Sequence, residues 1–269
     1  MADKKTSQNP DDNVSSTEII HFGDLFNFRD LGGLPTNSHE LTKEGLIYRT
    51  GNMTHLHKET AAYLTEQLGI TTYIDFRGEQ EIKQFGRPEV LLEAGIEWVN
   101  IHIEADDVEF AKLTHPKPED WVQLYVRLFE KNMVGWAKFL KLIRDTETPV
   151  MYGCLFGKDR TGIATGLLLN HLDVQREFIF ADYSKTTKGL FPNVSRLKEV
   201  WEKTKLTEEE VLEHYLSAHP EIITGFLGHY LDKSYHAFQK LTGGIDELDI
   251  KLKEKLLKPE LKPTINAKF

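Results

Sequence analysis

The chain has very little cysteine: Cys154 is the one such residue among 269. A single cysteine excludes an internal disulfide, so we expect a reducing compartment, the cytoplasm. The sequence also lacks a long apolar run, since no stretch approaches the roughly 20 residues that a membrane-spanning helix requires. Residues 1–17 are polar and carry no apolar segment of the kind found in secretion signals, so we expect a flexible tail there. Export by a route without a cleavable signal stays open.

An excess of basic charge is missing as well. Lys and Arg together number 33 against 42 Asp and Glu, a net charge of −9 at pH 7. This balance argues against a nucleic-acid-binding protein, and any anion site must create its own positive field. The histidines are scattered without a partnered ligand set, so we expect no metal or other cofactor. Nothing in the sequence indicates an oligomeric state.

Apolar periodicity predicts an α/β fold, with a mostly parallel sheet of four to five strands flanked by helices. The segments expected to form strands are residues 45–49, 70–76, 96–103 and 149–152. Helices are expected at residues 58–68, at 119–144 as two helices meeting near 132–135, and at 161–171. We expect residues 18–269 to form a single domain whose C-terminal region, about 174–257, is helical with breaks near Pro192, Pro220 and Gly243.

The segment with the clearest chemistry runs from Pro149 to Gly162 and reads P-V-M-Y-G-C-L-F-G-K-D-R-T-G. A predicted strand ends just before Cys154, and a predicted helix begins at Thr161. Backbone N–H groups in such a loop, together with the helix N-terminus, form a binding site for an anion. Because Cys154 and Arg160 stand at the two ends of the loop, a thiolate and a guanidinium can meet at one phosphate. The pattern indicates a phosphatase that acts through a cysteinyl-phosphate.

Two other interpretations of the loop were open. A lone cysteine at a strand end is often just a small buried apolar residue. A nucleotide-binding P-loop has similar glycines, but the spacing from Gly153 to Gly157 is one residue too short for G-x-x-x-x-G-K, and Asp159 stands where a Ser or Thr would bind magnesium. The combination of Cys, Gly, Lys-Asp-Arg and Thr-Gly at one strand-to-helix junction favours the phosphatase.

The loop resembles the H-C-x-x-G-K-D-R-T-G signature of the microbial tyrosine-phosphatase-like family. Further resemblances occur in the same order along most of the chain, at residues 27–30 (N-F-R-D), 45–50 (G-L-I-Y-R-T), 75–81 (D-F-R-G-E-Q-E), 181–183 (A-D-Y) and 241–244 (L-T-G-G). The resemblance implies a cysteine-phosphatase-like fold and a metal-independent phosphatase. Its implied substrates are proteins phosphorylated on tyrosine, serine or threonine, phosphoinositides, or both.

The resemblance also assigns roles to residues. It implies that Cys154 is the nucleophile, Arg160 the phosphate-binding guanidinium and Asp159 the general acid. The remaining loop residues would bind substrate: Leu155, Phe156, Gly157, Lys158, Thr161 and Gly162. The charge of Lys158 beside Arg160 suggests room for a second phosphate, which favours phosphoinositides. Asp75 and Arg77, at the end of a predicted strand, either border the loop or form a structural ion pair.

The general acid had other candidates in this chain. Asp106 and Asp107 follow a predicted strand, and Asp120 stands 34 residues before Cys154. These carboxylates are otherwise typical of solvated loops and helix starts. We favour Asp159 over all three.

One position departs from the family pattern: Gly153 stands where the family has His. This change motivates an alternative, a pseudophosphatase that binds phosphate without hydrolysing it. A sulfur-transfer enzyme with a persulfide on Cys154 is a more remote alternative, which Asp159 and Arg160 disfavour.

Overall fold

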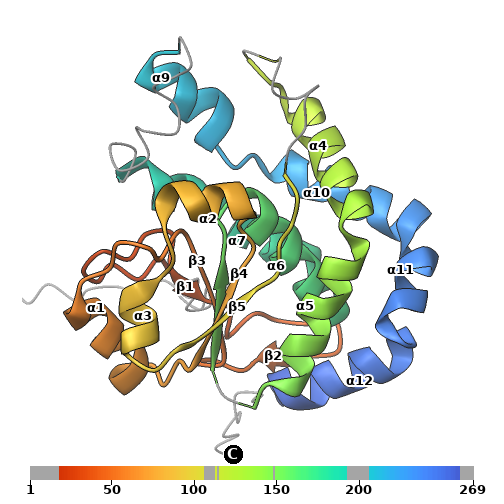
Figure 1. The fold of residues 1–269 in the computed structure, drawn as a ribbon. Coiled ribbons are helices and arrows are strands. Elements are labelled where there is room, and N and C mark those ends of the chain that lie inside the picture. The colour runs from red at the N-terminus through yellow and green to blue at the C-terminus, as the bar shows by residue number, and fades with distance from the viewer. Residues whose placement is uncertain (1–17, 106–112, 114, 148, 193–205, 261–269) are drawn as a thin grey trace, which may run out of the picture.

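The computed structural model describes residues 18–105, 113, 115–147, 149–192 and 206–260. Their centre is a five-stranded sheet of order β1-β3-β6-β4-β5 (Figure 1). The strands are β1 (Arg29–Asp30), β3 (Ile47–Thr50), β6 (Val150–Gly153), β4 (Thr72–Asp75) and β5 (Glu97–Asn100). Strand β1 is antiparallel to β3, whereas the pairs β3–β6, β6–β4 and β4–β5 are parallel. The predicted mostly parallel sheet is confirmed.

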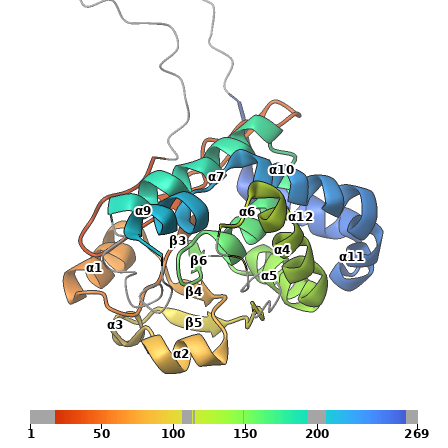
Figure 2. The same ribbon diagram turned by 90° about the horizontal axis from the view of Figure 1, so that it is seen from above.

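Helices cover both faces of this sheet (Figures 1 and 2). Before the loop the chain forms α1 (Lys58–Ala62), α2 (Glu79–Phe85), α3 (Glu89–Glu93), α4 (Pro118–Lys131) and α5 (Met133–Asp145). After it come α6 (Asp159–His171), α7 (Arg176–Leu190), α9 (Glu208–Val211), α10 (Pro220–His229), α11 (Tyr235–Thr242) and α12 (Ile245–Leu256). Three π-helical turns, Tyr63–Gln67, Leu212–Leu216 and Tyr230–Ser234, extend α1, α9 and α10.

The two faces of the sheet pack into different cores because successive side chains of a strand point to opposite sides. Val150 and Tyr152 of β6 belong to the larger apolar cluster, together with side chains of α4, α5, α6 and α10. Met151 between them belongs to a second cluster, with side chains of α1 and α3. All four residues of β6 are buried, as expected for a central strand with helices on both faces.

The sheet brings the ends of three strands to one level. In the parallel register, Gly153 of β6 is paired with Thr50 of β3 and with Asp75 of β4. The chain leaves β6 at this level, forms the loop that begins at Cys154 and enters α6 at Asp159. The loop therefore lies at the carboxyl ends of the strands, where open α/β sheets place their ligand sites.

The C-terminal helices pack mainly on the helices that flank the sheet, α10 on α4, α6 and α7, and α11 and α12 on α5. They are also tied to the N-terminal part of the chain. Leu248, Leu252 and Leu256 of α12 share the larger cluster with Ile47 of β3. Next to them β2 (Glu40–Thr42) pairs antiparallel with β7 (Leu257–Pro259). That residues 18–269 form one domain stays a prediction.

Several local predictions differ from the structure. The junction of α4 and α5 at Asn132 is as predicted, but α6 begins two residues before the expected Thr161. The short helices α2 and α3 and the strand pair β2–β7 were not predicted. The expected tail at residues 1–17 and the expected helical residues 193–205 lie outside the described part. Within the described residues, no helix is both long and apolar enough to span a membrane.

Candidate active site

The loop after β6 directs its carbonyl groups outward. The carbonyl oxygens of Leu155, Phe156 and Gly157 all accept hydrogen bonds from groups outside the loop. The donors are the backbone N–H of Asn52 (3.1 Å), the side-chain amide of Asn27 (3.1 and 2.9 Å) and the guanidinium of Arg49 (2.8 Å). In a trans peptide the C=O and the N–H point in opposite directions. The N–H groups of the three following residues therefore point away from these partners, as an anion cradle requires.

Only a glycine fits at the tightest point of the loop. Gly157 has a φ of +67°, and a Cβ on it would lie 2.4 Å from the carbonyl oxygen of Thr50. Both facts exclude a side chain there, because this φ is unfavourable for other residues and the contact is with backbone. The glycine lets the loop turn close against β3, where the guanidinium of Arg49 donates to the carbonyl of Gly157.

A buried polar network supports the loop from below. Asp182 of α7 accepts hydrogen bonds from Arg29 (2.7 Å) and Arg49 (2.5 Å). Burial and the charge of Arg49 lower the pKa of Arg29 to about 10. Burial alone would raise the pKa of Asp182, but the two arginines outweigh it and hold that pKa below its usual range. Two guanidiniums and one carboxylate leave a net positive charge beneath the loop.

Cys154 lies at the base of the loop. Its side chain is 2% exposed, and its Sγ accepts a hydrogen bond from the hydroxyl of Thr161 at 3.2 Å. A hydroxyl donor stabilises a thiolate more than a thiol, since the thiolate carries the full charge. Thr161 thus contacts the sulfur directly.

Arg160 is held by Glu81, a residue of α2. Its Nη1 and Nη2 donate to the two carboxylate oxygens of Glu81 at 2.5 and 2.6 Å, and Nη1 also donates to the carbonyl of Phe76 at 3.3 Å. Burial would lower the pKa of Arg160, but the Glu81 hydrogen bonds raise it above its usual value, and the charge of Cys154 acts in the same direction. Glu81 occupies the end of the guanidinium, so the Nε–H and the second Nη2–H form an open side. That side matches two oxygens of a phosphate.

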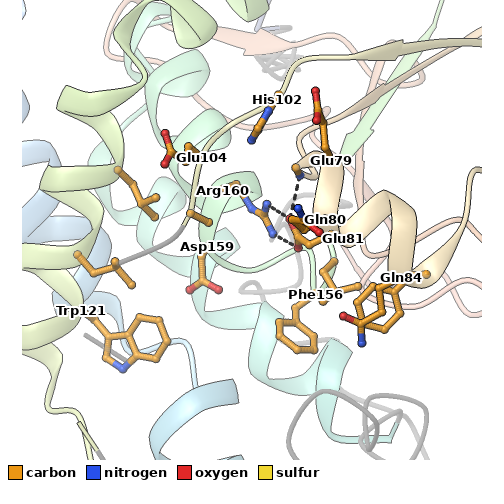
Figure 3. A pocket seen from close by; sticks show the side chains of 16 residues that line it. Glu79, Gln80, Glu81, Gln84, His102, Glu104, Trp121, Phe156, Asp159 and Arg160 are labelled. Atoms are coloured by element: carbon orange, nitrogen blue, oxygen red, sulfur yellow. Dashed lines mark hydrogen bonds and ion pairs between the residues drawn. The ribbon is translucent and has the colours of Figure 1, made fainter. Parts of the chain in front are cut away.

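A cleft of about 650 Å³ opens over the end of the loop. Its lining includes Leu155, Phe156, Asp159 and Arg160 of the loop region, whereas the buried Cys154 is not among the described residues that line it. Figure 3 shows Arg160 near the centre of this pocket and Asp159 beside it. The cleft therefore gives a substrate access to the guanidinium and to one candidate acid.

Asp159 occupies a position suited to proton transfer. Its Oδ1 accepts a hydrogen bond from the hydroxyl of Tyr125 at 2.8 Å, and that hydroxyl is 2.7 Å from the hydroxyl of Tyr183. Burial, reinforced by the Asp159 charge, raises the pKa of Tyr125 well above its usual value, so Tyr125 stays protonated. Asp159 is held by one oxygen and lines the cleft with the rest of its side chain.

The other candidate acids do not share this position. Asp120 accepts a hydrogen bond from the backbone N–H of Lys117 at 2.8 Å and so caps the start of α4. It is not among the described residues that line the cleft. Asp106 and Asp107 lie outside the described residues. The geometry available favours Asp159.

Lys158 is buried behind the cleft-lining residues Trp121 and Asp159. Its Nζ lies 3.5 Å from the ring centroid of Trp121 and 3.6 Å from Oδ1 of Asp159, and it donates to the carbonyl of Tyr215 at 2.5 Å. The side chain is fully buried, and this burial lowers the pKa of Lys158. The amine does not line the cleft within the described part of the chain, so the structure gives no support to the second phosphate that was expected beside Arg160. A role in substrate binding stays a prediction for the backbone N–H of Lys158.

The family of the chain follows from comparison with known sequences. A model of the tyrosine phosphatase family matches residues 20–258, which is most of the chain. The chain belongs to this family. The resemblance to a tyrosine-phosphatase family is thereby confirmed.

Individual relatives are distant. A Cupriavidus necator protein named as a tyrosine-protein phosphatase is 27% identical over 183 residues, which make up 65% of each chain, just under two thirds of the relative. The core catalytic domain of the PP-IP phosphatase SIW14 from S. cerevisiae is 19% identical, with a TM-score of 0.35 over 70% of this chain and 85% of that one. TpbA of P. aeruginosa is 12% identical, with a TM-score of 0.33 over 80% and 97%. At such TM-scores these likenesses do not bear on substrate or mechanism.

The glycine that replaces the family histidine has a steric explanation. A Cβ on Gly153 would lie 2.8 Å from the carbonyl oxygen of Thr50 and 3.0 Å from that of Gly51. Both atoms belong to the backbone of β3 and its continuation, which cannot move aside cheaply. In this family member the strand next to β6 lies too close for any side chain at residue 153.

Asp75 and Arg77 form a buried ion pair beside the loop. The Nη2 of Arg77 donates to Asp75 at 2.7 Å, and Nη1 of Arg77 donates to Thr54 at 2.9 Å. Phe76 between them donates its N–H to the carbonyl of Gly153 at 2.8 Å and accepts a hydrogen bond from Arg160. Neither charged group lines the cleft. The pair therefore borders the loop through the backbone of Phe76.

Three supporting residues were not predicted as parts of the site: Asn27, Arg49 and Glu81. All three lie within segments that resemble the family. For Asn27 and Arg49 a usable signal was present, because each is a polar residue next to aromatic ones in a short segment near a glycine turn, whereas Glu81 stands among polar residues. The sequence did not show which loop atoms they would contact.

Proposed function

We propose that this protein is a cysteine-dependent phosphatase that hydrolyses phosphomonoesters through a cysteinyl-phosphate. The proposal is supported mainly by the loop, whose carbonyl groups are held outward around Cys154 while Arg160 keeps one side open. These groups suit a phosphate with three terminal oxygens, since N–H donors and a guanidinium can meet the charge that develops during transfer.

In the first step the Cys154 thiolate attacks phosphorus. A sulfur–phosphorus bond forms while the bond from phosphorus to the ester oxygen breaks. Protonated Asp159 gives its proton to the leaving oxygen, so that an alcohol or phenol departs. The N–H groups of the loop and the open side of Arg160 hold the three remaining oxygens.

In the second step Asp159, now a carboxylate, takes a proton from a water molecule. The water oxygen attacks phosphorus as the sulfur–phosphorus bond breaks, which releases inorganic phosphate and restores the thiolate. Every group used belongs to this chain, so we expect activity without an added metal. Within the described residues no group of three or more His, Cys, Asp or Glu side chains is placed to hold a metal ion.

The experiment that tests this proposal is turnover of a phosphotyrosyl peptide and an aryl phosphate in the presence of EDTA. Wild type should turn over both, Cys154→Ser neither, and a rapid quench in denaturant should trap up to one phosphate per wild-type chain in iodine-labile form. Asp159→Asn should slow the peptide by about 100-fold or more, within the range for a general acid, and a substrate with a good leaving group by less. EDTA-sensitive turnover would contradict the mechanism.

The pseudophosphatase remains the alternative function. It predicts that wild type binds vanadate and phosphopeptide but releases no phosphate. The close approach of Thr50 to Gly153 gives the glycine a structural reason, and for that reason we favour the active enzyme.

A further inference from the structure

The cleft over the loop is lined by acidic groups. Among its described lining residues there is one guanidinium, that of Arg160, and there are four carboxylates: Glu79, Glu81, Glu104 and Asp159. Arg160 is already paired with Glu81, and the amine of Lys158 is buried against Trp121, 3.6 Å from Asp159, which leaves Glu79 and Glu104 without a cation from the loop. Positive charge is therefore concentrated at the phosphate position, and the surroundings of that position are negative.

The walls of the cleft also carry apolar surface. Trp121, Leu124 and Leu128 of α4 line one part, and Phe156 of the loop lines another. Figure 3 shows Trp121 and Phe156 on the same side of Arg160, beyond Asp159, while Glu79 and Glu104 lie towards the opposite edge with His102. An aromatic ring can pack between the apolar groups while its phosphate reaches Arg160.

Glu79 and Glu104 have no role in holding the loop. Glu79 is exposed on the first turn of α2, and no ion pair or side-chain hydrogen bond is found for it within the described residues. Glu104 pairs with Lys131 at 2.7 Å, and both side chains are about half exposed. Such surface pairs are weak and exchange readily for another cation. Both carboxylates are therefore available to a ligand in the cleft.

We propose that Glu79 and Glu104 are specificity-determining residues that select phosphotyrosine flanked by lysine or arginine and disfavour ligands that carry several phosphates. This inference rests on the proposed function, because it concerns the same cleft. A basic side chain next to the phosphotyrosine meets a carboxylate at the rim, whereas an acidic side chain or a second phosphate meets a like charge. The charge of Lys158 does not argue for a phosphoinositide, since its amine does not line the cleft within the described residues; the phosphoinositide that the family resemblance implies is the competing substrate in the test.

The test compares kcat/KM for two phosphotyrosyl peptides that differ only in having Lys or Glu on both sides of the phosphotyrosine, with a soluble inositol polyphosphate as a third substrate. We expect wild type to prefer the Lys peptide by about 10-fold at low ionic strength, the size expected for one or two charge pairs near a protein surface. The preference should shrink as salt is added. The inositol polyphosphate should be turned over more slowly than either peptide.

The variants are Glu79→Gln, Glu104→Gln and the double substitution. The double variant should reduce the ratio of kcat/KM for the Lys peptide to that for the Glu peptide to near one. Each single variant should reduce this ratio in part. Glu93→Gln on α3 is the matched control, because Glu93 is exposed and, among the residues that the structure describes, pairs only with Lys58 and does not line the cleft. It should keep the wild-type ratio, and thermal melts of all variants verify folding.

Equal turnover of the two peptides by wild type would overturn the inference, as would a ratio that the double variant leaves unchanged or a preference for the polyphosphate. Failure of the proposed function would look different, since wild type would then hydrolyse neither peptide. In that case the charge preference is tested by measuring the dissociation constant of each peptide from the Cys154→Ser protein. Equal dissociation constants would refute the preference.

Discussion

Replacing Glu81 by Gln tests how Arg160 is held in place. The change keeps the size of the side chain but removes its charge and one of its two acceptor oxygens. Wild-type Glu81 accepts two hydrogen bonds from Arg160, at 2.5 and 2.6 Å, and the two side chains are 24% and 8% exposed. The guanidinium in Glu81→Gln keeps one of these bonds at most, so its open side is no longer fixed towards the phosphate.

The size of the effect follows from these contacts. Hydrogen bonds to charged groups contribute about 1.5–3 kcal/mol, and the loss of about 2 kcal/mol at the transition state corresponds to roughly a 30-fold lower kcat/KM. Burial would raise the pKa of Glu81, but the hydrogen bonds and charge of Arg160 outweigh it and keep that pKa below its usual value. The carboxylate stays ionised above about pH 4, so the loss should be the same across a neutral assay range.

The measurement is kcat/KM with a phosphotyrosyl peptide, together with the inhibition constant of vanadate. Both should weaken in Glu81→Gln and stay at wild-type values in Glu93→Gln, which removes an exposed carboxylate that does not line the cleft. A Glu81→Gln enzyme that is faster than wild type would refute the reasoning. It would mean that Glu81 competes with the substrate for Arg160 and does not orient it.

Three further changes test the support of the loop. Asn27→Ala removes the amide that holds two loop carbonyls, so we expect about 10-fold lower kcat/KM and a stability loss of about 1–3 kcal/mol; a lower melting temperature with unchanged kcat/KM would contradict this role. Gly153→His should lower stability by about 1–3 kcal/mol without a gain in rate, because the Cβ of the new side chain meets the carbonyl of Thr50. A variant that is both more stable and faster than wild type would show that this contact does not exclude a side chain. Asp182→Asn should lower stability by about 3–5 kcal/mol at pH 7, since two buried guanidiniums lose their carboxylate. The pKa of Asp182 is depressed in the folded state, so its contribution is complete above the unfolded pKa of about 4 and is lost as the pH falls further; urea titrations at pH 7 and pH 3 should show the gap between wild type and Asp182→Asn narrowing in acid.

Local sequence patterns were enough to predict the centre of the fold. Strand β6 could be expected because Val150, Met151 and Tyr152 are apolar and stand before a glycine, and the helix after the loop because apolar residues recur behind Thr161. Both signals are local, since they depend on which side chains must be buried within a few residues. The predictions were weakest for short elements such as α2 and α3, which span 7 and 5 residues and are too short to show a repeating helical pattern.

The composition of the loop likewise indicated which chemistry to expect, because a cysteine and an arginine with five residues between them across a strand-to-helix turn suit few ligands other than phosphate. The roles of Asn27, Arg49 and Glu81 required the tertiary structure, since each is separated by more than 70 residues from the loop group that it holds. The same applies to Lys158: its sequence position beside Arg160 suggested a second phosphate contact, whereas packing against Trp121 buries its amine. Residue types and spacing along the chain thus determined which chemistry to expect of this protein. Where each charged side chain lies, and which group it contacts, was decided by burial and by partners that only the folded chain brings together.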